Sequence, residues 1–263
     1  MFDAEQIRLA TFARHVEIHD TLGSTNDRAA KLARSGDIEL PALVVARHQT
    51  AGKGRGRNTW WSADGALTFS VLIDSASMGV LPANWPQLSL ATAVAVCDGL
   101  RGELHQVGTS LGIKWPNDVL LDGGKVCGIL VESPGGAAPA KNRLILGIGI
   151  NVNNAWRAAP REAGASGTAL CDVTGRQHNL QAVLVRVLEA MATRIAQLRS
   201  HDTQLIHDWQ RLDLLAGRTI RIERDGRRIA GECRGIGQDG ALIVDTAYGH
   251  HRIFSGTVRP SFY

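Results

Sequence analysis

Three glycines alternate with three cations over residues 52–57, in the sequence GKGRGR. Glycine lets backbone N–H groups approach an anion closely, and lysine and arginine neutralise phosphate or carboxylate oxygens. The segment matches neither the P-loop nor the dinucleotide-binding glycine pattern. A solvated basic loop is an equally good interpretation of these residues alone, so the chemistry they indicate is anion binding without a specified anion.

Three further segments combine polar side chains with strand-like apolar runs. KWPND at 114–118 is compatible with a simple Asx turn. In KVCGILVE at 125–132, Lys125 stands at the mouth of an apolar run, and Gly128 would let a ligand lie against the backbone. GIGIN at 147–151 ends in Asn151, whose amide oxygen could bind a metal ion. Each segment alone also has an ordinary structural explanation, such as a turn or a hairpin end.

The remaining pattern predicts the elements that would position these segments. Helical spacing of apolar residues predicts helices at 26–35, 88–104, 180–199 and 202–215. Short apolar runs predict strands at 16–20, 42–48, 67–73, 111–115, 119–121, 126–131 and 143–150. Residues 134–141 and 155–169 are expected to be loops. From Gly217 onward, short strands at 219–223, 228–234, 241–245 and 251–254 alternate with glycine turns, which predicts a small β-barrel.

Composition excludes several protein classes. The chain has 263 residues, 44% of them hydrophobic, and its net charge of +4 is too small to indicate a dedicated nucleic-acid binder. Its apolar runs are too short for a membrane span. Four scattered cysteines without a CxxC pair argue against a zinc site or a disulfide framework, so we expect a cytoplasmic protein.

Taken together and in this order, the motifs resemble those of the biotin protein ligases, which attach biotin to carboxylase carrier domains. The resemblance covers nearly the whole chain, and KWPND followed by GILVE is its most specific part. The matching segments are Ser24-Thr25-Asn26, Gln49 with the glycine–arginine loop to Trp60, KWPNDV at 114–119, KVCGILVE at 125–132, GIGIN at 147–151, DWQRLD at 208–213 and GALIV at 240–244.

The resemblance implies an α+β fold in two domains. Residues 1–216 would form the biotin- and ATP-binding ligase domain, a mixed β-sheet with helices like the catalytic domains of class II aminoacyl-tRNA synthetases and biotin synthetases. Residues 217–263 would form a small Src-homology-3-like β-barrel. Because the matching core begins by about residue 16, the short form without an N-terminal DNA-binding domain is expected. The basic loop departs from the family pattern GRGRxGRxW, so no role is carried over to Gly56 or Arg57.

The implied reaction has two steps: biotin and ATP form biotinyl-5′-AMP, and a lysine of the biotin carboxyl carrier protein then takes the biotinyl group. Arg55 and Lys125 would be the catalytic cations, with Lys53 beside Arg55. The implied biotin-binding set is Ser24, Thr25, Asn26, Gln49, Gly52, Lys53, Arg55, Lys125 and Gly128. Trp60, Asn117, Asp118 and Asn151 would bind ATP or the adenylate, and Asn151 would also bind Mg²⁺.

Two alternatives stay open at this point. One is a lipoate ligase or octanoyltransferase, which shares the fold. The other is a biotin-sensing binding protein without catalysis. The expected partner is the carrier protein of acetyl-CoA carboxylase or of a related carboxylase. We expect no DNA binding, no membrane association, and a monomer or weak homodimer.

Overall fold

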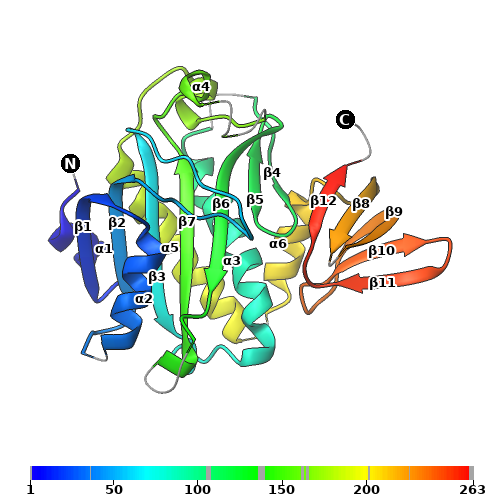
Figure 1. Ribbon diagram of the computed structural model, residues 1–263, viewed down its shortest axis with the longest axis horizontal. Coiled ribbons are helices and arrows are strands. Elements are labelled where there is room, and N and C mark those ends of the chain that lie inside the picture. The colour runs from blue at the N-terminus through cyan, green and yellow to red at the C-terminus, as the bar shows by residue number, and fades with distance from the viewer. Residues whose placement is uncertain are drawn as a thin grey trace.

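The computed structural model describes residues 2–260 apart from 36, 105–107, 136–139, 161–162, 164–165, 201 and 225. Within these residues, a seven-stranded sheet forms the larger part of the molecule, in the order β1-β2-β3-β7-β6-β5-β4 (Figure 1). Its strands are β1 (His15–Leu22), β2 (Ala42–Gln49), β3 (Ala66–Asp74), β4 (Leu111–Lys114), β5 (Asp118–Leu121), β6 (Gly124–Glu132) and β7 (Arg143–Asn151).

Burial explains why the middle strands of this sheet are almost continuously apolar. Every residue of β7 is buried, as are all but the last residue of β3. β1 and β2 run parallel, joined through a helix, and every other neighbouring pair is antiparallel. A sheet covered on both faces has no solvent side on which polar residues could alternate.

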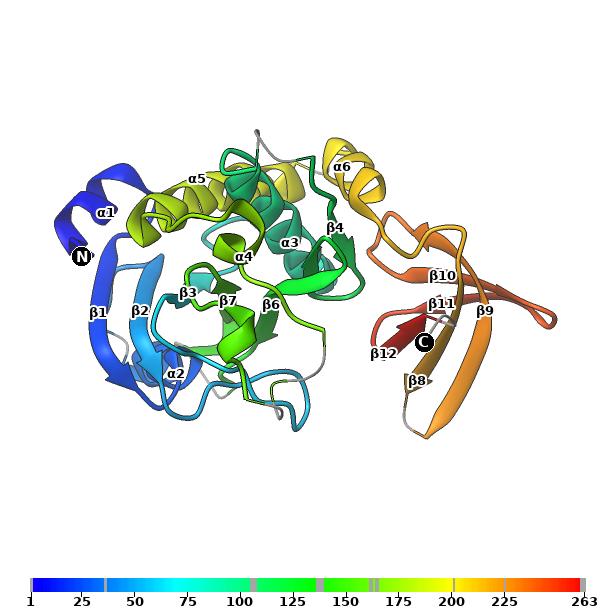
Figure 2. The same ribbon diagram turned by 90° about the horizontal axis from the view of Figure 1, so that it is seen from above.

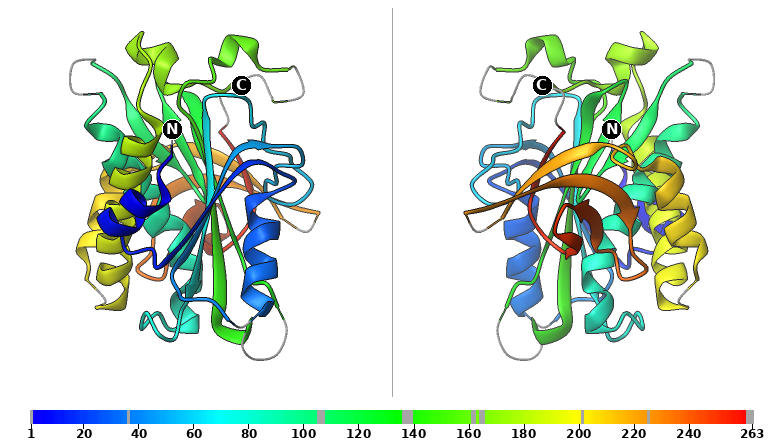
Figure 3. Two further views of the ribbon diagram at one scale, coloured as in Figure 1. Left: turned by 90° about the vertical axis from the view of Figure 1, so that its left-hand side faces the viewer. Right: turned by 90° about the vertical axis from the view of Figure 1, so that its right-hand side faces the viewer.

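Helices cover both faces of the sheet. Figure 2 shows α1, α3 and α5 along one face and α2 on the other, and Figure 3 shows the same two layers from the side. The helices are α1 (Ala4–Ala10), α2 (Thr25–Ser35), α3 (Trp85–Arg101), α4 (Leu170–Thr174), α5 (Leu180–Arg199) and α6 (Gln204–Leu212). None of the described helices is long and apolar enough to cross a membrane.

The C-terminal strands form a separate antiparallel sheet beside the β4 edge of the large one (Figure 1). Its order is β11-β10-β9-β8-β12, with β8 (Thr219–Arg224), β9 (Arg227–Ile236), β10 (Leu242–Thr246), β11 (Gly249–Ile253) and β12 (Thr257–Pro260). Sequence pattern predicts the first four of these strands. It misses β12, whose four residues include a proline and are too few to show an alternation.

The predicted elements of the large domain are confirmed with small shifts. The helix expected at 88–104 begins earlier, at Trp85, and ends at Arg101. The helix expected at 180–199 has those bounds. The pattern misses the short helices α1 and α4, which are too brief for a clear period. The predicted loops at 134–141 and 155–169 contain short 3₁₀ turns, and parts of both lie outside the described residues.

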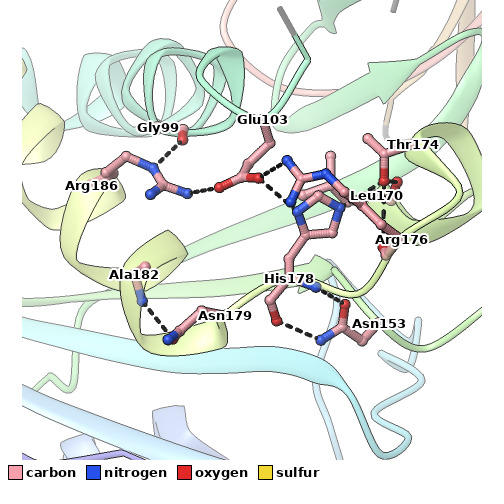
Figure 4. A network of polar contacts seen from close by, with 10 residues as sticks. All are labelled: Gly99, Glu103, Asn153, Leu170, Thr174, Arg176, His178, Asn179, Ala182 and Arg186. Atoms are coloured by element: carbon pink, nitrogen blue, oxygen red, sulfur yellow. Dashed lines mark hydrogen bonds and ion pairs between the residues drawn. The ribbon is translucent and has the colours of Figure 1, made fainter. Parts of the chain in front are cut away.

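A buried polar network holds the chain that follows β7 (Figure 4). Glu103 accepts hydrogen bonds from His178, at 2.7 Å, and from Arg176 and Arg186. Asn153 exchanges two hydrogen bonds with the backbone of His178, at 2.8 and 2.9 Å. Burial alone would raise the pKa of Glu103, but the hydrogen bonds from His178 and Arg176 and the charge of Arg186 outweigh burial and lower it. The carboxylate therefore stays charged and ties the segment after β7 to the end of α3.

A second ion pair joins α2 to the edge strand β1. Arg28 donates two hydrogen bonds of 2.7 Å to the carboxylate of Glu17. The Arg28 hydrogen bond, acting against burial, lowers the pKa of Glu17 to about 2. Because the folded pKa lies below the ordinary value of 4.5, the stabilisation is present above that value and is lost as the pH falls toward 2.

We expect Glu17→Gln to lower the free energy of unfolding at pH 7 by about 1–2 kcal/mol, since partial solvent exposure screens the pair. The loss should shrink as the pH is lowered toward 2, where wild-type Glu17 is itself protonated. Urea unfolding at several pH values measures this dependence. Glu5→Gln, in the exposed Glu5–Arg8 pair, serves as the control with no measurable change. An equal loss at all pH values would contradict the prediction.

Candidate active site

A pocket of about 280 Å³ brings most of the predicted site residues together. Its walls come from the start of α2, the end of β2, the basic loop, the turn before β5, and strands β6 and β7. The predicted residues that line it are Ser24, Thr25, Asn26, Gln49, Lys53, Arg55, Trp60, Asn117, Asp118, Lys125 and Gly128. Gly52 and Asn151 are not among the lining residues.

The part of the pocket lining at the start of α2 consists of buried polar side chains, called the polar floor below. Gln49 Oε1 accepts the backbone N–H of Thr25 at 2.7 Å and lies 3.1 Å from the Thr25 hydroxyl. Ser70 Oγ lies 2.7 Å from Thr25 Oγ1 and 2.6 Å from Asn26 Oδ1. Asn26 Nδ2 donates to Glu132 at 2.7 Å. This part of the pocket is therefore suited to a polar, uncharged group rather than to an apolar chain.

The floor depends on a close approach between α2 and β7. A Cβ at Gly147 would lie only 2.1 Å from Asn26 Oδ1, so a side chain there would push the helix start away from the sheet. The glycines of GIGIN thus permit the close packing that their sequence pattern indicates.

Lys125 enters the pocket from β6. Its Nζ lies 2.6 Å from a carboxylate oxygen of Asp118, on the neighbouring strand β5. The same Nζ lies 5.9 Å from the centre of the Trp60 ring. Lys125 also pairs through its backbone with the segment at Gly167. The lysine is thus held at a fixed place by contacts on its side chain and on its backbone.

Trp60 lies flat against two glycines that face each other across β6 and β7. Gly128 and Gly149 are register partners, and a Cβ at Gly149 would meet the indole at 2.3 Å. The Trp60 Nε1 is buried and has no hydrogen-bond partner. An unpaired indole N–H is costly, so this position suits a group that meets a ligand acceptor or moves when a ligand binds.

The basic loop folds as a tight hairpin. Gly54 N donates to Asn58 O, and Trp60 N donates to Gly52 O. Gly52 shapes this turn without lining the pocket: a Cβ there would lie 2.5 Å from the Trp60 carbonyl oxygen. The loop thereby directs Arg55 into the pocket.

The Arg55 guanidinium donates to the Gly256 carbonyl at 3.2 Å and lies 3.5 Å from Asn117 Oδ1. Burial lowers the pKa of Arg55, and Asp118 partly offsets this effect. Lys53 instead pairs with Asp27, whose hydrogen bond raises the lysine pKa. Both cations line the pocket, but Arg55 is half-buried and has no carboxylate paired with it in a salt bridge among the described residues, whereas Lys53 is exposed and paired with Asp27.

Asn151 is placed differently from the other predicted residues. Its side chain is 1% exposed. Nδ2 donates to the carbonyls of Lys125 and Thr168, and Oδ1 accepts from Asn154 at 2.9 Å. Asn151 thus links the backbone of β6 at Lys125 to the neighbouring segment at Thr168. The described residues contain no group of three or more His, Cys, Asp or Glu side chains that could hold a metal ion.

The sequence interpretation leaves the role of the C-terminal sheet open between ligand binding and a structural cap, and it assigns none of its residues to the pocket. Gly256, Thr257 and Val258 line it, and Gly256 accepts the hydrogen bond from Arg55 across about two hundred residues of chain. Lys114 and Trp115, quoted in the KWPND motif but given no role, line it as well. No local pattern marks Gly256, because its carbonyl reaches the site through domain packing alone.

We expect Gly149→Ala to displace Trp60, because the new methyl group would overlap the indole ring. Ligand binding to the pocket should weaken by about tenfold or more, because forcing a packed side chain out of place costs about 1–3 kcal/mol. Tryptophan fluorescence and ligand titration measure the two effects. Gly102→Ala is the matched control, since a Cβ there meets nothing within 4 Å. Unchanged fluorescence and affinity would refute the prediction.

Comparison with known proteins identifies the family. The model for the biotin/lipoate A/B protein ligase family matches residues 19–151, and that for the biotin protein ligase C-terminal domain matches residues 216–258. The chain is 33% identical to the biotin–(acetyl-CoA-carboxylase) ligase of Mycobacterium tuberculosis, over 88% of this chain and 84% of that protein. It is 35% identical to the ligase of the same name from Paracoccus denitrificans, over 84% of this chain and 90% of that one.

Among solved structures, it is similar to "Biotin protein ligase from Aquifex aeolicus in complex with biotin and ATP". The TM-score is 0.80 at 27% identity, over 94% of this chain and all of that one. The resemblance inferred from the motifs is confirmed. With both parts of the chain matched in order, and with relatives above 30% identity along most of its length, the protein belongs to the biotin/lipoate A/B protein ligase family.

Proposed function

We propose that this chain is a biotin protein ligase, which activates biotin with ATP as biotinyl-5′-AMP and transfers the biotinyl group to a lysine of a biotin carboxyl carrier protein. The observation that carries the proposal is one pocket lined both by buried polar side chains, Thr25 and Gln49 among them, and by the cations Arg55 and Lys125. This pattern matches a substrate with a neutral polar ring at one end and a carboxylate at the other.

The polar floor favours biotin over lipoate or octanoate. A ureido ring supplies N–H donors and a carbonyl acceptor for Thr25, Gln49 and Ser24. An octanoyl chain or a dithiolane ring would offer those same side chains neither a donor nor an acceptor, and a polar atom that lost its bound water to such a ligand would cost about 1–3 kcal/mol. Lys53 and the backbone near Gly128 would border the alkyl tail, with Asn26 supporting the floor from below.

The cations align two anions for the first step. The biotin carboxylate oxygen attacks the α-phosphorus of ATP and forms a new P–O bond. The bond from that phosphorus to the bridging oxygen breaks, and pyrophosphate leaves. Lys125 and Arg55 would neutralise the charge that gathers at the carboxylate–phosphate junction, where two anions otherwise repel each other. Trp60, Asn117 and Asp118 would lie on the nucleotide side, while Asn151 would act through the Lys125 backbone.

In the second step, the carrier lysine amine attacks the carbonyl carbon of the mixed anhydride. An amide bond forms, AMP leaves with the electron pair of the C–O bond, and the amine loses a proton. Asp118, which is paired with Lys125, is the only carboxylate among the described residues that line the pocket, and it could take this proton. No covalent protein nucleophile is needed for either step.

Mg²⁺ would enter with ATP. The Asp118 carboxylate and Asn117 Oδ1 offer the oxygen ligands it prefers, and phosphates and water would supply the rest. Bound there, the ion would neutralise phosphate charge.

We further propose a catalytic domain of the class II synthetase type at 1–216 and a Src-homology-3-like barrel at 217–263.

The carrier of acetyl-CoA carboxylase, named in the relatives, is the proposed partner. The cytoplasmic location, the absence of DNA binding and the monomer or weak dimer remain predictions.

The deciding experiment incubates the protein with ATP, Mg²⁺, a biotin carrier domain and either biotin, lipoate or octanoate. We expect pyrophosphate release only with biotin, and streptavidin detection of the carrier. Modification of the carrier by lipoate or octanoate instead would assign the acyl-transfer alternative. Biotin binding without pyrophosphate release would assign the binding-protein alternative.

A further inference from the structure

The polar floor continues beyond the pocket as a chain of short hydrogen bonds. From the surface inward, Glu132 contacts Asn26, Asn26 contacts Ser70, and Ser70 contacts Thr25. Ser70 is fully buried, and Asn26 is 5% exposed. Neither Ser70 nor Glu132 is among the residues that line the pocket.

The carboxylate at the end of the chain sets the orientation of Asn26. A carboxylate only accepts hydrogen bonds, so the side-chain nitrogen of Asn26 must face Glu132. The amide oxygen then faces Ser70, which must donate its single hydroxyl proton to Asn26 to make their 2.6 Å contact. Ser70 therefore has no proton left for Thr25.

The donor–acceptor direction of the Ser70–Asn26 hydrogen bond also fixes the direction of the next hydrogen bond, at Thr25. Its contact with Ser70 is 2.7 Å. Because a hydroxyl carries one proton and Ser70 has committed its own to Asn26, the Thr25 hydroxyl is the one left to donate in this contact. Gln49 Oε1 accepts the Thr25 backbone N–H, which also makes it an acceptor. Thr25 Oγ1 and Gln49 Oε1 lie 3.1 Å apart. Because the two hydroxyl protons of Ser70 and Thr25 are taken by the two shorter contacts, none is left for this one.

Two acceptor oxygens this close repel each other until a donor bridges them. We propose that Glu132, Asn26 and Ser70 are positioning residues whose fixed hydrogen-bond direction makes Thr25 and Gln49 a paired acceptor, selective for a ligand with a ring N–H. The inference rests on the proposed function, because it names how the same pocket selects its substrate. It assigns roles to Ser70 and Glu132, two residues outside the pocket wall.

The test uses Ser70→Ala, which removes the middle of the chain and frees the Thr25 proton to turn toward Gln49. Biotin binding to the full chain is measured by calorimetry without ATP. Its affinity for biotin should fall about tenfold, the value of one buried hydrogen bond. The second ligand is biotin with its ureido nitrogens methylated, which has no N–H donor.

Wild type should prefer biotin over the methylated ligand strongly, and Ser70→Ala should lose about tenfold of that preference. Glu132→Gln should shift the preference in the same direction by a smaller factor, since a glutamine can present either an acceptor or a donor. Ser70→Thr keeps a hydroxyl at this position and should therefore keep the wild-type preference for biotin over the methylated ligand.

The matched control is Thr68→Val, two residues earlier on the same strand. It also removes a fully buried hydroxyl, one that donates to the Ala46 carbonyl. The control should preserve the preference even where stability falls. An unchanged preference in Ser70→Ala, or an equal loss in Thr68→Val, would overturn the inference while leaving the proposed function intact. A wild-type protein that binds no biotin would overturn both.

Discussion

Replacing Lys125 by alanine is expected to lower biotin-dependent pyrophosphate release by at least about a thousandfold while the protein stays folded. The ammonium group lies in the pocket, 2.6 Å from Asp118, and is partly open to solvent. Its charge would stabilise the phosphate and carboxylate oxygens as the P–O bond forms. Removing it leaves two anions to approach each other with less positive charge to offset their repulsion.

The size of the effect should depend on charge and position. Lys125→Arg keeps the charge and should retain part of the activity, although a planar guanidinium cannot reproduce a compact ammonium group. Lys31→Ala, on the exposed side of α2, is the control with normal activity. Circular dichroism and thermal unfolding check the fold of each variant. Near-normal pyrophosphate release from Lys125→Ala would remove this lysine from the mechanism.

Replacing Arg55 by alanine is expected to release the adenylate into solution. Arg55 is half-buried, and its guanidinium connects the basic loop to the Gly256 carbonyl of the C-terminal domain. It would bind the intermediate through charge-assisted hydrogen bonds and also hold the loop over the pocket. Loss of one such bond to a charged group corresponds to about a tenfold to hundredfold faster dissociation.

The measurement separates protein-bound from free biotinyl-5′-AMP by rapid filtration after incubation with biotin and ATP. Arg57→Ala is the matched control: it lies two residues along the same loop, but its side chain is exposed and outside the pocket lining. We expect Arg57→Ala to retain the intermediate as the wild type does. Equal retention in Arg55→Ala and wild type would count against the assigned role.

Lys53 and Arg55 show that residues in equivalent positions of one motif can have different environments in the fold. The alternating loop makes the two cations equivalent in sequence. In the structure, Lys53 is paired with Asp27 on α2, whereas Arg55 is half-buried and donates a hydrogen bond to Gly256 of the C-terminal part. Asn151 gives a similar result. Its motif predicts a ligand contact, but its amide is taken up by backbone carbonyls behind Lys125.

The amino-acid sequence by itself determined the secondary-structure elements and the kinds of side chain available to the site. Apolar runs predicted strands near their observed bounds, because a strand buried on both faces of a sheet must be apolar along most of its length. Alternating glycines and cations predicted an anion site, because backbone approach and charge are local properties of a loop. Motifs that stand in the right order along the chain were sufficient to recognise the family.

Tertiary structure alone decided which of these groups meet. Gly256 reaches Arg55 from the other domain, and Ser70 and Glu132 contact the helix start from β3 and β6. Such contacts depend on how strands are ordered in a sheet and how two domains pack. Those arrangements are set by the summed burial of many residues far apart in the chain, so no local window of sequence records them.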